Sequence, residues 1–361
     1  MEYVLAQFRD RIAAAGAKKT ALRFVGSGSK DWYGNALQGE VFDTRAYTGI
    51  VCYDPTELVI TARCGTPLAE IESALAEHGQ MLAFEPPHFG PHATIGGVVA
   101  SGLSGPRRAT AGALRDFVLG AAMMDGKGQI LHFGGRVMKN VAGYDVSRLL
   151  AGSLGVLGLI LEVSIKVLPK AVAETTLRFE MNQADALRRL NEWAGQPLPI
   201  SASVWQGGVL RLRLSGAGAA VEAAQRKTGG ENIGPAAEMW TDLREQHSEF
   251  FAGMSSNDVL WRLSLPSVAA PLPLPVEQMI EWGGAQRWLK IDRHADVAHI
   301  RNVAEQAGGH ACLFRGGDQV MRTEAGVFHP LAPVVAKLHR NLKAAFDPAG
   351  IFNPGRLMVD L

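Results

Sequence analysis

The amino-acid sequence predicts an α+β protein made of two regions. Strand patterns and helix patterns follow one another along the chain of 361 residues, a length that corresponds to about two domains. Glycine and tryptophan are unevenly distributed: residues 86–160 hold 15 of the 41 glycines, whereas residues 171–310 hold six of the seven tryptophans. We therefore expect the two regions to have different tasks.

The first region opens with an amphipathic helix, MEYVLAQFRDRIAAAG. Short apolar runs ended by turn residues predict strands at residues 21–25 and 58–62. A helix should follow in GTPLAEIESALAEHGQ, where Leu68, Ile71 and Leu75 lie on one stripe. Two more strands within residues 116–135 are joined by Asp-Gly-Lys-Gly, which is typical of a hairpin, and residues 157–168 alternate until a proline stops them.

The second region alternates in the same way. Strands are expected at residues 175–181, 285–292 and 310–316, with a hairpin across residues 201–216. Helices are expected at residues 183–195, 219–230 and 295–309. The last helix, within residues 331–346, should bury one stripe of apolar side chains before Asp-Pro breaks it; that stripe is Val335, Leu338, Leu342 and Phe346.

Composition excludes several classes of protein. The net charge is +1, with 36 basic and 35 acidic residues and no basic run with interleaved aromatics, so nucleic acid is not an expected partner. No stretch approaches the ~18 uncharged apolar residues of a membrane span, and we expect a cytoplasmic location. Cys52, Cys64 and Cys312 form no CxxC pair, which argues against a disulfide framework, a zinc knuckle or iron-sulfur ligands on this chain.

The stretch ATIGGVVASGLSGPRRATAG, residues 93–112, has five glycines and few large side chains. Glycines let a ligand approach the backbone, and aligned N–H groups attract anions such as a pyrophosphate. Two short segments fit this description and are expected to be loops, Gly26-Ser27-Gly28-Ser29 and Thr94-Ile95-Gly96-Gly97. Ordinary tight turns explain them equally well. The chain has no GxxxxGK[ST] sequence, which excludes a P-loop, and GSGSKD lacks the GxGxxG spacing of a Rossmann fold. A nucleotide would therefore need a different kind of binding site.

The order of the motifs is more specific than any single one. The segments FVGSGSKDWYG, ELVITARCGTPLAEIESALAEHGQMLAFEPP, ATIGGVVASGLSGPRRATAGALRDFVLGAAMMDGKGQIL and GRVMKNVAGYDVSRLLAGSLGVLGLILEVSIKVLPK together resemble the FAD-binding domain of the vanillyl-alcohol-oxidase (PCMH) type. The tail FDPAGIFNPGRL resembles the C-terminal signature of the same flavoproteins. The resemblance spans roughly the first 170 and the last 50 residues, and within the family it is greatest to FAD-binding subunits of bacterial glycolate dehydrogenases.

The resemblance implies a fold and a cofactor site. Residues 1–170 would form a PCMH-type domain of two α+β subdomains, residues 171–315 a smaller α+β (ferredoxin-like) cap, and residues 316–361 a return to the flavin domain. Non-covalent FAD would lie with its pyrophosphate against residues 26–29 and 94–97. The other residues implied near the cofactor are Ser101, Gly102, Lys139, Gly155, Gly158 and Asn353.

Several further side chains have two interpretations. Arg107 and Arg108 could bind a phosphate or a substrate carboxylate, or make only loop or subunit contacts. His88 and His92 are candidates for covalent flavin attachment, which is not expected in this branch of the family. Tyr144 is expected to be a packed ring.

The chain departs from the catalytically complete members of the family. They carry a GDGNLH-type motif and a metal-ligating histidine pair in the cap. Here only Gly316-Gly317-Asp318-Gln319 remains, and His247, His294 and His299 are not paired along the sequence. Substrate oxidation on this chain alone is therefore in question, and no catalytic residue is assigned.

The resemblance also implies partners and a reaction. Within a complex, glycolate or another 2-hydroxy acid would be oxidised, and electrons would leave through an iron-sulfur subunit to a quinone. A larger paralogous FAD subunit would be the other partner, and the complex could be peripheral at the inner membrane. Two alternatives remain: a self-sufficient FAD-dependent 2-hydroxy-acid or alcohol dehydrogenase, and a structural paralogue that has lost the cofactor.

Overall fold

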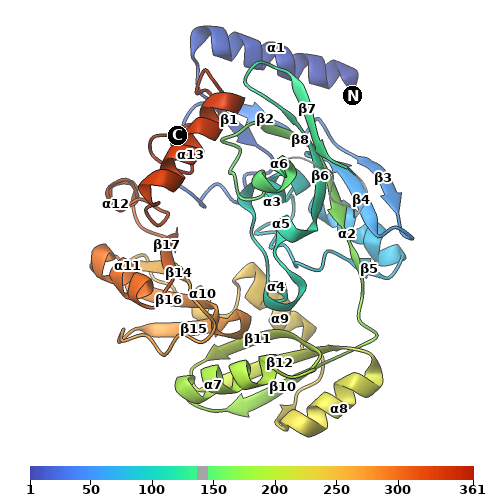
Figure 1. The fold of residues 1–361 in the computed structure, drawn as a ribbon, viewed down its shortest axis with the longest axis vertical. Helices are drawn as coiled ribbons and strands as arrows, with labels where there is room; N and C mark the ends of the chain where they lie inside the picture. Colours follow the sequence, from blue (N-terminus) through green and yellow to red (C-terminus); the bar gives the residue numbers. More distant parts are fainter. Residues whose placement is uncertain (136–144) are drawn as a thin grey trace. The chain divides into compact units, whose positions relative to one another are not determined.

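The computed structural model describes residues 1–135 and 145–361, and Figure 1 shows their helices and strands. They form two units. The first contains residues 1–103, 113–169 and 330–361, and the second contains residues 104–112 and 170–329.

The described residues of the first unit contain the helices α1 (Glu2–Lys18), α2 (Leu68–Glu77), α3 (Ile95–Ser101), α5 (Leu114–Phe117), α6 (Val146–Leu149) and α13 (Pro333–Phe346). Their strands are β1 (Leu22–Val25), β2 (Glu40–Asp43), β3 (Ile50–Asp54), β4 (Val59–Arg63), β5 (Gln80–Met81), β6 (Val118–Met124), β7 (Ile130–Gly134), β8 (Leu159–Lys166) and β9 (Leu168–Pro169).

The described strands of the first unit form one five-stranded sheet and two strand pairs, one of which joins β5 and β9. Five antiparallel strands form a sheet in the order β3-β4-β8-β6-β7, and β1 pairs in parallel with β2. The predicted hairpin is confirmed as β6 and β7. Helix α1 covers the β1–β2 pair with the side chains of Phe8 and Ile12, and the Phe8 ring lies 5.0 Å from that of Phe42. The C-terminal tail reaches the other side of β1, where Leu22 and Phe352 form a bridge.

The second unit contains the helices α4 (Arg108–Ala111), α7 (Gln183–Ala194), α8 (Gly218–Thr228), α9 (Ala237–Glu245), α10 (Glu249–Ala252), η1 (Trp282–Gly284), α11 (Val297–Gln306) and α12 (Gln319–Ala325). Its strands are β10 (Ala173–Glu180), β11 (Ile200–Gln206), β12 (Val209–Gly216), β13 (Glu231–Asn232), β14 (Asp258–Ser264), β15 (Glu277–Glu281), β16 (Gln286–Asp292) and β17 (His310–Arg315).

The eight strands of the second unit form one sheet in the order β13-β10-β12-β11-β15-β16-β14-β17. The first half runs β10-α7-β11-β12-α8-β13 along the chain, which is the β-α-β-β-α-β arrangement of ferredoxin-like folds. The second half has the same strand order, with a loop over residues 265–276 in place of its first helix. The sequence predicted an α+β, ferredoxin-like region, and the observed sheet joins two such halves edge to edge.

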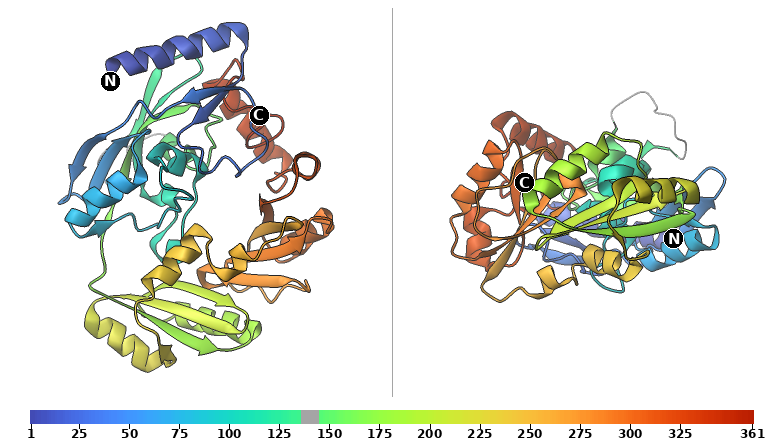
Figure 2. Two further views of the ribbon diagram at one scale, coloured as in Figure 1. Left: turned by 180° about the vertical axis from the view of Figure 1, so that it is seen from behind. Right: turned by 90° about the horizontal axis from the view of Figure 1, so that it is seen from below.

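Each half of this sheet has its own apolar core. Helices α7 and α8 cover one face of β10 and β12 (Figure 2). Leu190, Trp193 and Val221 of these helices belong to one apolar cluster with alternate residues of β12, which are Leu210, Leu212 and Leu214. In the second half, Ile300 and Val303 of α11 pack on Trp261 and Leu313. The period of 3.6 in the helices and of 2 in the strands therefore places the apolar faces against each other.

Two sequence predictions are corrected by the structure. The apolar stripe of α13 was expected to be buried, but Val335 is 40% and Leu338 is 56% exposed, and the buried face of this helix carries Ala336 and Lys343 instead. The segment Thr94–Gly97 was expected to be a loop, but it is the N-cap and first turn of α3.

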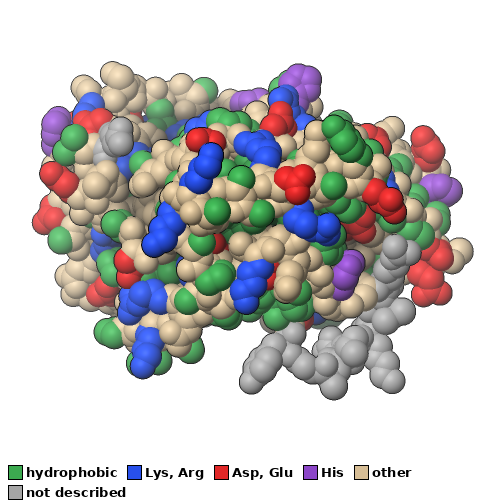
Figure 3. Space-filling view, turned by 90° about the horizontal axis from the view of Figure 1, so that it is seen from above, with side chains coloured by type: hydrophobic (Ala, Val, Ile, Leu, Met, Phe, Trp, Pro, Cys, Tyr) green, Lys and Arg blue, Asp and Glu red, His purple; other side chains and the backbone are tan. Residues whose placement is uncertain are grey.

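The surface of the described residues has a mixed character. On the face shown in Figure 3, basic and acidic side chains are interspersed with apolar ones. Within residues 1–135 and 145–361, no helix combines the length and the apolar composition needed to cross a bilayer.

Candidate functional site

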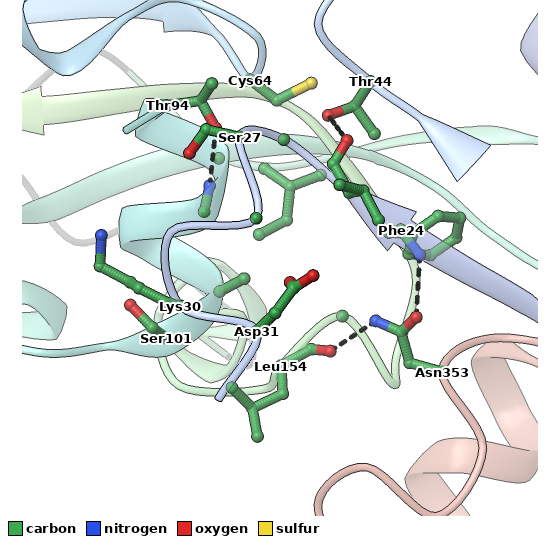
Figure 4. Close-up of a pocket in the computed structure, with 18 of the residues that line it drawn as sticks. Phe24, Ser27, Lys30, Asp31, Thr44, Cys64, Thr94, Ser101, Leu154 and Asn353 are labelled. Atoms are coloured by element: carbon green, nitrogen blue, oxygen red, sulfur yellow. Dashed lines mark hydrogen bonds between the residues drawn. The ribbon is translucent and has the colours of Figure 1, made fainter. Parts of the chain in front are cut away.

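The first unit holds an open pocket that is lined by both polar and apolar residues, as small-molecule and cofactor sites are (Figure 4). Most of its walls come from four segments that are far apart in sequence. They are the turn after β1, the start of α3, the segment that leads into β8, and the C-terminal tail. All of them belong to the first unit.

The turn after β1 supplies unsatisfied hydrogen-bond donors. Within the described chain, the backbone N–H groups of Gly26, Ser27 and Gly28 have no hydrogen-bond partner. Gly28 has φ +75°, which an L side chain rarely adopts, and a Cβ on Gly26 would overlap the Thr94 hydroxyl. The turn therefore exposes bare backbone to the pocket and packs directly against the start of α3.

The start of α3 forms the second wall. Thr94 is the N-cap, and its Oγ1 accepts a hydrogen bond from the N–H of Gly97 at 3.4 Å. A Cβ on Gly97 would meet only that oxygen, also at 3.4 Å, so this position has free space. The N–H groups of Ile95 and Gly96 donate to carbonyls of the segment after β4. Consequently the turn after β1, rather than α3, provides most of the free donors.

Asn353 joins the remaining walls. Its Oδ1 accepts from the N–H of Phe24 at 2.9 Å, and its Nδ2 donates to the carbonyl of Leu154 at 2.7 Å (Figure 4). A Cβ on Gly155 would lie 2.6 Å from Nδ2, which leaves no room for a side chain there. Asn353 thus fixes the spacing between β1 and the segment before β8, and both of its amide groups are used within the protein.

The structure brings most of the sequence-predicted cofactor residues to this one pocket. Those that line it are Gly26, Ser27, Gly28, Ser29, Thr94, Gly96, Gly97, Ser101, Gly155, Gly158 and Asn353. Ile95 is fully buried and Gly102 ends α3 against Gly152, so neither lines it. Lys139 and Tyr144 lie outside the described residues.

Comparisons with known proteins relate the chain to FAD-binding proteins. Residues 5–134 match the FAD binding domain, and residues 330–357 match the C-terminal domain of FAD linked oxidases. Glycolate oxidase subunit GlcE of Escherichia coli (strain K12) is 49% identical over 352 residues, which cover 98% of this chain and 97% of the relative. The chain belongs to the GlcE family.

More distant proteins are similar to this chain in part of its sequence or in its fold. A D-lactate dehydrogenase of Archaeoglobus fulgidus is 31% identical over 183 residues, which cover 49% of this chain and 40% of the relative. Alkyldihydroxyacetonephosphate synthase matches in structure with a TM-score of 0.62 at 15% identity, over 96% of this chain and 73% of the other. The fold class and the relationship to FAD-linked oxidases predicted from the sequence are confirmed.

Several residues that line the pocket of this GlcE-family chain were not predicted from the sequence. They are Phe24, Val25, Lys30, Asp31, Leu37, Thr44, Cys64, Ala100, Leu154, Leu159, Ile160 and Arg356. Arg356 is 7% exposed and donates to the carbonyls of Asp31, Tyr33 and Asn35. Its only signal in the sequence was its place directly after the Asn-Pro-Gly of the tail.

The side chains considered for covalent attachment are not in the pocket wall. Neither His88 nor His92 lines it, and His88 Nε2 lies 2.9 Å from Glu72 Oε2. Cys64 does line it, but burial raises the pKa of its thiol to about 12. A thiol with that pKa stays protonated at neutral pH and is a poor nucleophile.

Arg107 and Arg108 have partners within the second unit. Arg107 Nη2 donates to Glu174 Oε2 at 3.1 Å, and the Arg108 guanidinium lies 4.4 Å from the centre of the Trp282 ring. The Trp282 indole N–H in turn donates to the carbonyl of Gly105 at 3.1 Å. These contacts favour the interpretation of both arginines as loop contacts that hold residues 104–112 in place.

The cap residues compared with the family motif are dispersed. Asp318 caps α12 and forms an ion pair with Arg293. His247 lies near Asp242, and its side chain is 68% exposed. Within the described residues, no group of three or more His, Cys, Asp or Glu side chains is placed to hold a metal ion.

The pocket residues fit a flavin dinucleotide. A diphosphate needs N–H donors and backbone without side chains, and the turn at residues 26–28 offers both. A flavin and an adenine need apolar contacts, which Phe24, Leu37, Leu154 and Ile160 provide. The space beside Gly97, which no side chain fills, lies next to the N–H donors at residues 26–28.

Proposed function

We propose that this chain is the FAD-binding subunit of a glycolate dehydrogenase (glycolate oxidase) complex that oxidises glycolate to glyoxylate. The observation that carries the proposal is the 49% identity to glycolate oxidase subunit GlcE over almost the whole length of both chains. The glycine-lined pocket supports it, because the residues matched to the FAD-linked family converge on one cavity.

In this proposal the described residues bind and orient the cofactor. The N–H groups at residues 26–28 bind the diphosphate, and the bare backbone at Gly97 leaves room for it. Asn353 keeps the two walls at the correct spacing. FAD, when bound, accepts two electrons and releases them singly, which suits delivery to an iron-sulfur partner and a quinone.

We propose non-covalent binding, because the histidines considered for attachment lie outside the pocket wall and the Cys64 thiol stays protonated. The relative is named as a subunit, which supports a multi-subunit assembly. The proposed partners are a larger paralogous FAD subunit and an iron-sulfur subunit. The proposed location is the cytoplasm, with contact to the inner membrane only through those partners. We assign cofactor binding to this chain and substrate turnover to the assembled complex.

The visible spectrum of the purified chain tests the proposal. We expect a yellow protein whose FAD is released by acid or denaturant, and whose flavin absorbance is not bleached by anaerobic glycolate or D-lactate. Bleaching by substrate would instead identify a self-sufficient dehydrogenase. A protein that stays colourless at every FAD concentration would identify a structural paralogue and refute the cofactor assignment.

The reconstituted complex provides the second half of the test. Co-expression with candidate partner subunits should yield an assembly that reduces a quinone analogue with glycolate. Lowering the flavin occupancy of this chain with the variant Gly97→Val should then lower the rate. An unchanged rate in an assembly whose Gly97→Val chain has been shown to hold no flavin would contradict a role for this site in turnover.

A further inference from the structure

Asp31 is the one acidic residue among the described residues that line the pocket. Its carboxylate points into the space between the turn after β1, Leu154 and Asn353 (Figure 4). Within the described chain, this carboxylate has no hydrogen bond and no ion pair. A charged acceptor that faces a ligand pocket without a protein partner is available to the ligand.

The backbone around Asp31 is firmly held. The N–H of Asp31 donates to the carbonyl of Gly28 at 3.0 Å, which closes the turn that carries the free donors. The carbonyl of Asp31 accepts from Arg356 Nη2 at 2.7 Å. Because the buried guanidinium of Arg356 also binds the carbonyls of Tyr33 and Asn35, the direction of the Asp31 side chain is built into the fold.

Gly28 makes the space that the carboxylate occupies. A Cβ on Gly28 would lie 3.3 Å from Asp31 Oδ2, which is tighter than ordinary van der Waals contact. The carboxylate therefore lies directly beside the donors at residues 26–28. The site presents N–H donors and one anionic acceptor next to each other.

The adjacent donors and acceptor restrict which ligand groups can lie there. An ionised carboxylate accepts hydrogen bonds and repels a phosphate, so the diphosphate must lie on the N–H side. A flavin dinucleotide carries hydroxyl groups on both sides of its diphosphate, on the ribityl chain and on the adenosine ribose. Hydroxyls are donors that suit a carboxylate, as when an acidic residue binds a ribose hydroxyl in other dinucleotide sites.

We propose that Asp31 accepts a hydrogen bond from a sugar hydroxyl of the flavin dinucleotide, and so fixes the register of the dinucleotide along the pocket. This inference rests on the proposed FAD site. Asp31 is a binding residue in this role, and Arg356 is the residue that positions it.

Equilibrium FAD binding to the cofactor-free full-length chain, measured by flavin fluorescence, tests the proposal. Asp31→Ala should bind FAD roughly 10- to 100-fold more weakly, because it loses a hydrogen bond to a charged group. Asp31→Asn should retain most of the affinity, since its amide oxygen still accepts. Asp10→Ala, on the exposed face of α1, is the matched control and should bind like wild type.

Two truncated ligands distinguish the sources of the hydroxyl. FMN has the ribityl chain without adenosine, and ADP-ribose has an adenosine ribose without the ribityl chain. If the ribityl hydroxyls are bound, Asp31→Ala weakens FMN; if the adenosine ribose is bound, it weakens ADP-ribose and leaves FMN unchanged.

The outcomes separate this inference from the proposed function. If wild type binds no FAD, both are wrong. If wild type binds FAD and Asp31→Ala binds it equally or more tightly, only the role of Asp31 is wrong, and tighter binding would identify the carboxylate as a simple repulsive charge. Circular dichroism of the cofactor-free variants confirms folding. If Asp31→Ala does not fold, Asp31→Leu, which has a side chain of similar size without an acceptor, serves as the test and should also bind FAD more weakly.

Discussion

Lys343 and Asp347 form an ion pair at the end of α13, with 2.7 Å between Nζ and Oδ2, and both residues are almost completely buried. The ammonium also donates to the carbonyls of Val156 and Phe352, and the carboxylate accepts from the N–H groups of Ile351 and Phe352. Val156 and Phe352 each adjoin a pocket-lining residue, Gly155 and Asn353. The pair therefore holds two walls of the candidate site from behind.

Removal of one partner should be costly. Burial lowers the pKa of Lys343, and the bond to Asp347 opposes that effect. Lys343→Met would leave the buried carboxylate without its cation, and we expect a loss of about 3–5 kcal/mol in the free energy of unfolding. Urea denaturation of the cofactor-free protein measures it. Arg340→Met is the control: Arg340 lies on the same helix, its ion pair with Asp360 of the tail is about half exposed, and its loss should cost at most ~1 kcal/mol. Equal losses in the two variants would refute the structural importance of the buried pair.

Gly97→Val tests the pocket by filling it. A Cβ at Gly97 would meet only Thr94 Oγ1, so the cofactor-free variant should fold. The larger side chain would occupy the space assigned to the diphosphate, and FAD affinity should fall roughly 10- to 100-fold. Gly218→Val at the start of α8 is the matched control, because no atom lies within 4 Å of a Cβ there. Wild-type affinity in Gly97→Val would exclude this wall from the cofactor site.

Arg107→Ala decides between the two interpretations of the arginine pair. The ion pair with Glu174 predicts a loss of stability of about 1–3 kcal/mol and no change in the dissociation constant of FAD. Removal of a residue that bound a phosphate of the cofactor would instead weaken FAD binding with little loss of stability. Parallel measurements of thermal unfolding and FAD titration on one preparation separate these results.

The sequence predicted the elements whose periodicity decides their burial. The stripe of Leu68, Ile71 and Leu75 is fully buried on α2, and the hairpin turn at Asp125 lies where Asp-Gly indicated. The same logic failed on α13, where Lys343 is buried and Leu338 is exposed. A hydrophobic pattern places a lysine on the surface, whereas the partners of the Lys343 ammonium, Asp347 and the carbonyls of Val156 and Phe352, explain why it is buried.

The residues of the candidate site also fall into those that the sequence predicted and those that it did not. Gly26, Gly97 and Asn353 were found because their motifs occur in a family order. Asp31 and Arg356 were missed because their relationship is a contact between a side chain and backbone carbonyls 325 residues away in sequence. Carbonyl groups are present at every residue, so such a contact leaves no mark in the sequence of its acceptor.

Tyr47 should make the stability of the protein depend on alkaline pH. Burial, assisted by the hydrogen bond to Glu162 at 2.8 Å, raises the pKa of its hydroxyl from 10 to about 12. Between pH 10 and 12 the unfolded chain has released this proton while the folded chain retains it, so the folded state binds more protons and loses stability as the pH rises. Below pH 10 the contribution is complete. Tyr47→Phe should therefore show a flatter decline of the free energy of unfolding from pH 10 to 12, measured by urea denaturation across that range. Tyr3→Phe, at a site that is 75% exposed, should follow the wild-type curve, and a Tyr47→Phe curve parallel to wild type would show that the hydroxyl is not protected by the fold.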